Sequence, residues 1–246
     1  MVEALQAPGL RRRCHRDSSV FLVEQPCPRT YHGSCPCVKI DRTAMVDEIR
    51  DGVRRTYRKR KRAADELRTR ERITEATVAL HESMGPGHTT VKAIAERAGV
   101  QRATVYRHFP DEEALFSACT ASYYARHPMP DPSGWARLSS PDERLVQALG
   151  ELYAWYAETE EMLFRSIRDL ERVPAGTREG FLGYFEGVRA ALMAGRHESG
   201  RARKRSAGAI GHAIGFPTWR SLVREQELDT DDAIALMVAM VDTARR

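Results

Sequence analysis

Apolar and polar residues follow a regular helical pattern along residues 90–109. Thr90 stands where a hydroxyl can cap the first free N–H groups of a helix, and Gly99 allows the positive φ at which a chain reverses direction. Between them, apolar residues recur at the three- and four-residue spacing of one helix face: Val91, Ile94, Ala95 and Ala98. The pattern predicts a short helix followed by a tight turn.

A second short helix is predicted from about Gln101. Val105 and Phe109 share its apolar side, and Val100 enters the core between the two helices. Two short helices joined by a glycine turn are typical of a helix-turn-helix, whose second helix fits the DNA major groove. A solvated helix in another kind of small helical domain would show the same periodicity, so that interpretation stays open. The polar side of the second helix carries Gln101, Arg102, Thr104, Arg107 and His108.

The same stretch resembles the DNA-binding signature of the tetracycline-repressor (TetR) family. The shared residues, from Thr90 to Leu115, are Thr-Val-x-x-Ile-Ala-x-x-Ala-Gly-Val-x-x-x-Thr-Val-Tyr-x-His-Phe-Pro-Asp-x-Glu-x-Leu. With the preceding helix, the likeness covers residues 67–123, under a third of the chain. It implies that one set of residues contacts base edges: Gln101, Arg102, Ala103 and Thr104. It implies phosphate contacts for a second set: Thr90, Lys92, Tyr106 and His108.

Some positions of this motif leave a choice or depart from the family pattern. Tyr106 and His108 also suit structural roles, and we expect Tyr106 to be partly buried. Glu112 stands where family members very often carry a lysine that contacts a phosphate, and a carboxylate cannot make that contact. Either the helix then lies further from the DNA backbone, or Lys92 and the basic residues before the motif supply more of the attraction.

Helical periodicity continues beyond the motif and predicts an all-α protein in three parts. Residues 1–64 are expected to be a disordered extension that ends in a basic arm, residues 65–110 a three-helix helix-turn-helix domain, and residues 111–246 a helical body. By the resemblance, this body binds an effector and forms a dimer. Helices are expected over residues 65–83, from about 110 to 123, twice within 141–170, from 177 to 193, and over 207–223 and 233–240, with loops over 127–134 and 195–206.

Positive charge is concentrated between Arg50 and Arg72, directly ahead of the motif. Like charges repel one another, so we expect this segment to be extended. It is then either a solvated linker or an arm that follows phosphates or enters the minor groove. The net charge of +5 is compatible with nucleic-acid binding without demonstrating it.

Residues 1–44 differ in composition from the rest of the chain and hold most of its cysteines. We expect no zinc site there, because zinc ligands generally come in pairs two to four residues apart within a small fold of their own. A translation start at Met45 would also fit the change in composition. No disulfide framework is indicated, so a reducing cytoplasm is the expected location. The residues considered for zinc are Cys14, His15, Cys27, His32, Cys35 and Cys37.

Composition and motifs narrow the classes of function. Charged residues make up 30% of the chain, and no apolar run approaches the roughly 18–20 residues that cross a bilayer, so no membrane partner is expected. No secretory signal is recognised at the start of the sequence. Glycine-rich phosphate loops, zinc-protease motifs and serine-hydrolase motifs are absent, so we expect no enzyme, no catalytic residue and no cofactor. A non-specific architectural DNA-binding protein or a helical adaptor is the alternative function.

The TetR resemblance also implies partners for the body. A homodimer would place two recognition helices in successive major grooves, about 34 Å apart, on a roughly palindromic operator. The last two helices would pack against their twins, although they also fit a core within one chain. A small hydrophobic effector would release a repressor from DNA. Its pocket has eight aromatic candidates, each of which also fits plain core: Trp135, Tyr153, Trp155, Tyr156, Phe164, Phe181, Tyr184 and Phe185.

Overall fold

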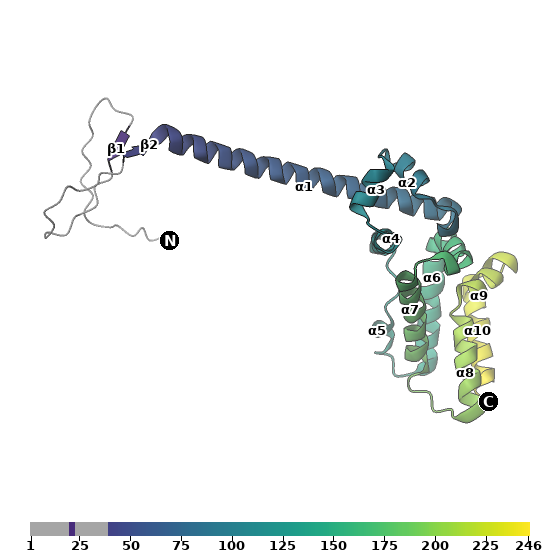
Figure 1. Cartoon of the computed structure of the whole chain (residues 1–246). Helices are drawn as coiled ribbons and strands as arrows, with labels where there is room; N and C mark the ends of the chain where they lie inside the picture. The colour runs from purple at the N-terminus through teal and green to yellow at the C-terminus, as the bar shows by residue number, and fades with distance from the viewer. Residues whose placement is uncertain (1–19, 23–38) are drawn as a thin grey trace, which may run out of the picture. The chain divides into compact units, whose positions relative to one another are not determined.

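The computed structural model describes residues 20–22 and 39–246, and most of these are helical (Figure 1). The chain divides into two compact units, one up to Leu67 and the other from Arg68 to Arg246. Helix α1, Arg42–Met84, runs through the boundary. None of the described helices combines the length and the hydropathy needed to cross a membrane.

In the first unit, a short β-hairpin precedes α1. Strand β1, Val20–Leu22, pairs antiparallel with β2, Lys39–Asp41, and Phe21 lies opposite Ile40. These two strands of three residues are a small exception to the all-α fold, which the helices of the structure confirm. The six cysteine and histidine residues considered for zinc lie outside the described residues.

The basic segment 50–62 is helical and exposed, so the prediction that it is extended is wrong. Two local features outweigh charge repulsion. Arginine and lysine are strong helix formers, and neither glycine nor proline interrupts residues 53–84. Opposite charges also stand four residues apart, as at Asp51 and Arg55 or at Lys61 and Asp65, a spacing that stabilises helices.

In the second unit, the end of α1 forms a three-helix domain with α2, Val91–Ala98, and α3, Arg102–His108. A 3-10 turn, η1, Pro86–His88, joins α1 to α2. Met84, the last residue of α1, is 38% exposed. The domain core consists of Ile73, Ala76, Leu80, Ile94, Ala95, Ala98, Val105, Phe109 and Leu115.

The body begins with α4, Glu112–Arg126, followed by the one-turn α5, Pro132–Trp135, and by α6, Pro141–Arg168. The predicted loop 127–134 thus ends in a helical turn, which Asp131 caps by accepting a hydrogen bond from the Ser133 N–H at 2.9 Å. The two helices predicted within 141–170 are one continuous helix. The polar residues between them do not interrupt it, because alanine and glutamate are strong helix formers, and the buried Thr159 hydroxyl donates to the Trp155 carbonyl oxygen at 2.6 Å.

The C-terminal half of the body differs from prediction at two places. After η2, Leu170–Arg172, and α7, Ala175–Met193, helix α8 covers Gly200–Ala213, so the predicted loop 195–206 is wrong from its sixth residue onward. The predicted helix 207–223 is divided into α8, α9, Phe216–Arg220, and the π-helical η3, Ser221–Glu225. Pro217 explains the break, because its ring would clash with the Ala213 carbonyl in an uninterrupted helix. The last helix, α10, is Thr230–Ala244.

Buried aromatic side chains on α6 hold this helix against the segment between α8 and α9. The Tyr153 hydroxyl donates to the Ala213 carbonyl oxygen at 2.9 Å, and the Tyr156 hydroxyl donates to the Ile214 carbonyl oxygen at 2.5 Å. Trp219 of α9 is fully buried, with its ring centroid 5.8 Å from that of Tyr156. These contacts make the aromatic face of α6 part of the body core.

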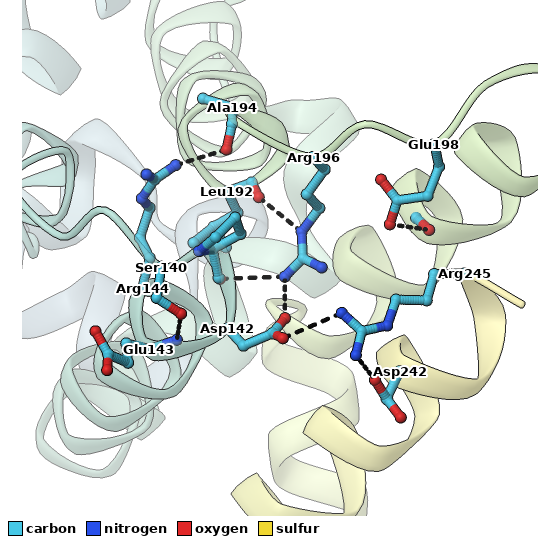
Figure 2. Close-up of polar contacts among 12 residues, drawn as sticks. Ser140, Asp142, Glu143, Arg144, Leu192, Ala194, Arg196, Glu198, Asp242 and Arg245 are labelled. Carbon is cyan, nitrogen blue, oxygen red and sulfur yellow. Dashed lines mark hydrogen bonds and ion pairs between the residues drawn. The ribbon is translucent and has the colours of Figure 1, made fainter.

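Two buried arginines join the start of α6 to the end of α7 and to α10 (Figure 2). Arg144 donates to the carbonyl oxygen of Ala194 at 2.8 Å, just beyond the end of α7. Arg196 lies 3.2 Å from the carboxylate of Asp142, which also pairs with Arg245 of α10 at 3.1 Å. Arg196 and Asp142 form an ion pair, and Arg144 satisfies carbonyl groups at the helix end, so we assign this cluster a structural role.

Candidate nucleic-acid interface and cavity

The helix-turn-helix is built from the local features that the sequence predicted. Thr90 caps α2, with its hydroxyl oxygen accepting a hydrogen bond from the Ala93 N–H at 3.2 Å. Gly99 has a φ of 64°, the left-handed conformation that closes the helix. Val100 follows, and its N–H donates to the Ala95 carbonyl oxygen at 2.9 Å while its side chain packs on the domain core.

Helix α3 is fixed from its inner side and from its end. Val105 is 1% exposed and Phe109 is 2% exposed, so both are anchored in the core. Arg70 of α1 donates a hydrogen bond to the His108 carbonyl oxygen at 2.6 Å, and its guanidinium lies 4.1 Å from the centroid of the Phe109 ring. The outward face of α3 is therefore held in one orientation relative to the domain core. Sequence reasoning missed Arg70, since nothing distinguishes it from the other basic residues of its segment.

The predicted base-contacting residues lie together on α3 and at its start. Gln101, Arg102 and Ala103 are exposed, and Thr104 is half-buried. The polar groups of Gln101 and Arg102 are thus accessible to a ligand that approaches α3 from solvent. An exposed guanidinium beside an exposed amide is the pair of groups that reads purine edges in a major groove.

The predicted phosphate-contacting residues are distributed over both helices. Thr90 and Lys92 are exposed at the start of α2, and the Lys92 ammonium lies 3.8 Å from the carboxylate of Glu96. His108 is half-buried at the end of α3. Tyr106 is 54% exposed, which corrects the expectation of partial burial. Its position explains this, because each residue turns about 100° around a helix and the neighbouring Val105 already faces the core.

Acidic residues begin α4, immediately after this face. Asp111 caps the helix, and its carboxylate accepts a hydrogen bond from the Ala114 N–H at 2.7 Å. Glu112 and Glu113 follow in the first turn, where negative charge is favourable next to the helix N-terminus. Glu112 is exposed and offers no positive charge to a phosphate.

A buried carboxylate joins the helix-turn-helix domain to the body. Asp169, at the end of α6, is 7% exposed and accepts hydrogen bonds from the Gly87 N–H at 2.9 Å and from the Arg168 guanidinium at 2.8 Å. The Arg168 hydrogen bond is the main reason why the pKa of Asp169 is lowered to about 2. Arg168 also donates to the Met84 carbonyl oxygen at 2.9 Å, and Arg172 donates to the Gly87 carbonyl oxygen at 3.1 Å.

Beside this junction lies a cavity of about 360 Å³. Its walls come from the end of α1 and η1, from α4, from α6 with η2, and from the first turns of α7. The end of the helix-turn-helix domain and the body therefore both line the same space. Representative lining residues are His81, Phe116, Cys119, Tyr124, Met162 and Phe181.

Of the eight aromatic candidates for a pocket, only Phe181 lines this cavity. Trp135 of α5 and three aromatic residues of α6, Tyr153, Trp155 and Tyr156, belong instead to the body core. The remaining three are also placed elsewhere: Tyr184 and Phe185 pack at the edge of the body core, and Phe164 is 42% exposed beneath the guanidinium of Arg220.

Two buried groups in the cavity wall are uncharged at neutral pH. Burial lowers the pKa of His81 to about 4, so its imidazole is neutral. Burial also raises the pKa of Cys119 to about 12, so its sulfur is a thiol, 3.5 Å from the His81 Nδ1 atom. Neither group gives the cavity a charge.

Comparison with protein families finds a match, over residues 73–119, to the family described as bacterial regulatory proteins, tetR family. These residues include the end of α1, both helices of the helix-turn-helix and the first half of α4. The matched part of the chain is thus the part that presents the exposed side of α3.

Two curated relatives are similar over the same region, each 37% identical over 70 residues, or 28% of this chain. They are the HTH-type transcriptional regulator SrpR and the uncharacterized HTH-type transcriptional regulator TtgW, both of Pseudomonas putida. The match spans 32% of SrpR and 51% of TtgW, so the body is not compared.

Solved structures resemble a larger part of the chain. A putative fatty acid metabolism regulator of Clostridium perfringens aligns with a TM-score of 0.51 and 20% identity, over 70% of this chain and 97% of its own. A TetR-like transcriptional regulator from Rhodococcus sp. RHA1 aligns with a TM-score of 0.50 and 19% identity, over 70% of this chain and 93% of its own. At this identity, the likeness concerns the fold alone.

Proposed function

Since this chain belongs to the tetR family of bacterial regulatory proteins, we propose that it is a sequence-specific DNA-binding transcriptional regulator. The observation that carries the proposal is the outward side of α3, where Gln101 and Arg102 are exposed above the buried Val105 and Phe109. A short polar helix face on a rigid support is what reading base edges in a major groove requires.

Within this proposal, each exposed group has a role set by its chemistry. The Arg102 guanidinium donates two hydrogen bonds to the O6 and N7 atoms of a guanine. The Gln101 amide forms two hydrogen bonds with the N6 and N7 atoms of an adenine. The methyl groups of Ala103 and Thr104 contact thymine methyl groups. The donors that hold the protein on phosphates are Thr90, Lys92, Tyr106 and His108.

The regulator acts as a homodimer on a roughly palindromic operator. Helix α10 supports a dimer surface, because Leu236 is 48% exposed and its neighbours Ile234, Val238 and Met240 are only half-buried. A two-fold interface buries such a patch twice. It also places the two α3 helices on half-sites about 34 Å apart.

A small apolar ligand in the cavity releases the protein, a repressor, from DNA. The cavity supports this step by its position, since its wall includes His81 and Pro86 next to the DNA-binding domain as well as Leu170 and Val173 of the body. The ligand shifts the protein away from the DNA-binding arrangement only to the extent that it binds the other arrangement more tightly.

DNase I footprinting tests this function. The purified full chain is incubated with the DNA upstream of its own gene at moderate salt. We expect protection of two inverted half-sites with centres about one helical turn apart. Even, unbroken protection of any duplex would instead indicate a non-specific architectural protein.

A further inference from the structure

The charge of the cavity wall is carried by Arg178. Apart from Arg178, the lining residues are apolar or are polar groups that are uncharged at neutral pH, and no aspartate or glutamate is among them. Tyr124, whose pKa burial raises to about 12, also stays neutral. The cavity is therefore an apolar space with one permanent positive charge at its wall.

Arg178 is half-buried on α7, and its side chain makes no hydrogen bond or ion pair with any residue that the structure describes. Glu113 of α4 contacts the same end of α7, but its carboxylate accepts a hydrogen bond from the Thr177 hydroxyl at 3.2 Å. The other half-buried arginines of the body each pair with a carboxylate: Arg165 with Glu161, Arg189 with Glu186, and Arg220 with Glu160 and Glu225. None of the Arg178 nitrogens is among the buried atoms without a partner in the described part of the chain, so the guanidinium is open to solvent and can pair with an anion that enters the cavity.

We propose that the cavity binds an amphipathic anion, an apolar molecule that carries one carboxylate, and that this carboxylate pairs with Arg178. The inference rests on the proposed function only for the regulatory consequence of binding. Arginine is suited to the role, because its planar fork of N–H groups accommodates both oxygens of a carboxylate. The apolar part of the ligand packs against Phe116, Met162 and Leu163.

The volume of the cavity limits the size of the ligand. A volume of about 360 Å³ lies at the lower end of the roughly 300–1,000 Å³ of known ligand sites. This favours a small ligand, and decanoate is a chain carboxylate of suitable size for a probe. A cationic amphiphile of the same length would meet Arg178 with a like charge and no carboxylate in the wall.

Isothermal titration calorimetry with three matched probes tests the proposal on the full chain without DNA. The probes are decanoate, 1-decanol and decylamine, each kept below its solubility and micelle limits at about pH 7, where the carboxylate and the amine are both charged. We expect decanoate to bind at least about tenfold more tightly than 1-decanol, which corresponds to about 1.4 kcal/mol. Decylamine should bind more weakly than either.

Variants assign the selectivity to Arg178. Arg178→Gln should weaken decanoate binding about tenfold and leave 1-decanol binding unchanged, while Arg178→Lys should retain part of the preference for the anion. Arg201→Gln is the matched control, because Arg201 is an exposed arginine of α8 that does not line the cavity. Far-ultraviolet circular dichroism confirms that each variant is folded.

The possible results separate this inference from the proposed function. Equal or tighter binding of 1-decanol or decylamine, no binding of any probe, or an unchanged decanoate affinity in Arg178→Gln would each overturn the anion assignment. All of these results leave footprinting on DNA unaffected. Conversely, selective decanoate binding by a protein that protects no half-sites would uphold the cavity assignment and refute the regulator.

Discussion

Single residues determine which side chains are exposed on the outward side of α3. Val105 and Phe109 are buried, and Arg70 donates a hydrogen bond to the His108 carbonyl oxygen at the end of α3. Arg102 is exposed and does not contribute to the domain core. A side chain of this kind can be removed with little effect on folding. It is therefore suited to a test of base readout.

Arg102→Ala should remove about 1–3 kcal/mol of preference for the operator over unrelated DNA, because one bidentate base contact is lost. Lys92→Ala is the comparison: the loss of a phosphate contact should weaken binding to all duplexes alike and lower the salt dependence. Fluorescence anisotropy with operator and scrambled duplexes measures both effects. Equal weakening on both duplexes by Arg102→Ala would argue against base readout.

Gly85 is a second residue with a defined physical role. Its φ is 92°, and a Cβ atom there would lie 2.5 Å from the Asp169 carboxylate. Gly85→Ala should therefore destabilise the protein by about 1–3 kcal/mol through backbone strain and displacement of Asp169. Gly150→Ala, in the interior of α6 with open space around it, should leave stability unchanged or raise it by up to about 1 kcal/mol. Urea unfolding compares the two variants.

Local chemistry made some of these residues predictable and left others hidden. The capping hydroxyl of Thr90 and the left-handed Gly99 act within a few residues of the chain, so the sequence shows their roles directly. Arg70 and Asp169 act on partners 38 and 82 residues away. The spacing of residues along the sequence does not predict such contacts, because they form only when the helices pack together.

Among the elements, the turn from α1 through η1 is held by the end of α6. The Asp169 carboxylate accepts a hydrogen bond from the Gly87 N–H. Arg168 and Arg172 donate hydrogen bonds to carbonyl oxygens on the same turn. The cavity lies beside this contact, with Pro86, Leu170 and Val173 in its wall. A change in the cavity thus has a direct physical path to the helix that leads into the helix-turn-helix.

The stability that Asp169 contributes should depend on pH in a defined direction. Its pKa is about 2 in the folded protein against about 3.9 in an unfolded chain, so its contribution is complete well above pH 3.9 and is lost as the pH falls through about 2. Asp169→Asn should cost about 1–2 kcal/mol near neutral pH and progressively less between about pH 4 and pH 2.

Urea unfolding at several pH values measures this dependence. Glu179→Gln serves as the control, because Glu179 is an exposed acid on α7 outside the junction. A difference between wild type and Asp169→Asn that stays constant down to pH 2 would show that the charge of Asp169 does not stabilise this contact.

The errors in predicted elements share a physical origin. The predictions rest on charge repulsion in segment 50–62 and on the polar residues before Glu160. Both segments are helical, because helix propensity outweighs these effects. At α8, the basic residues after Gly200 lie on the outer side of a helix whose Ser206 is fully buried. Polarity alone therefore does not predict a loop, because arginine, lysine and glutamate are themselves strong helix formers.

At the scale of the whole molecule, the proposed recognition of an operator requires the proposed two-fold arrangement. The proposed dimer surface on α10 presents Leu236, which is 48% exposed. Leu182 on α7 is similarly exposed, at 47%, and lies on a different helix. This pair of leucines allows the dimer surface to be tested with a substitution of the same chemistry at each site.

Leu236→Glu should shift the protein toward monomers and weaken operator binding at least about tenfold, because a charge would be buried at the interface and two linked half-sites would bind separately. Leu182→Glu should change neither property. Sedimentation velocity and DNA titration at the same protein concentrations measure the two effects. A dimer that survives Leu236→Glu would place the interface elsewhere on the protein.

Sequence reasoning predicted the structure of the helix-turn-helix domain more completely than that of the body. In the helix-turn-helix, core positions such as Ile94, Val105 and Phe109 follow directly from helical spacing. The cavity does not, because it is formed by four helical segments from distant parts of the chain. Aromatic character alone favoured Trp135 and Tyr153, whose rings are in fact fully buried in the body core.

The proposed function requires the outward side of α3 to distinguish one DNA sequence from others. The most direct test is a competition titration at moderate salt, in which unlabelled unrelated DNA displaces the full chain from a labelled duplex of its own upstream region. We predict a preference of at least about 1,000-fold for the upstream duplex, which Arg102→Ala reduces. Equal competition by both duplexes would contradict sequence-specific recognition.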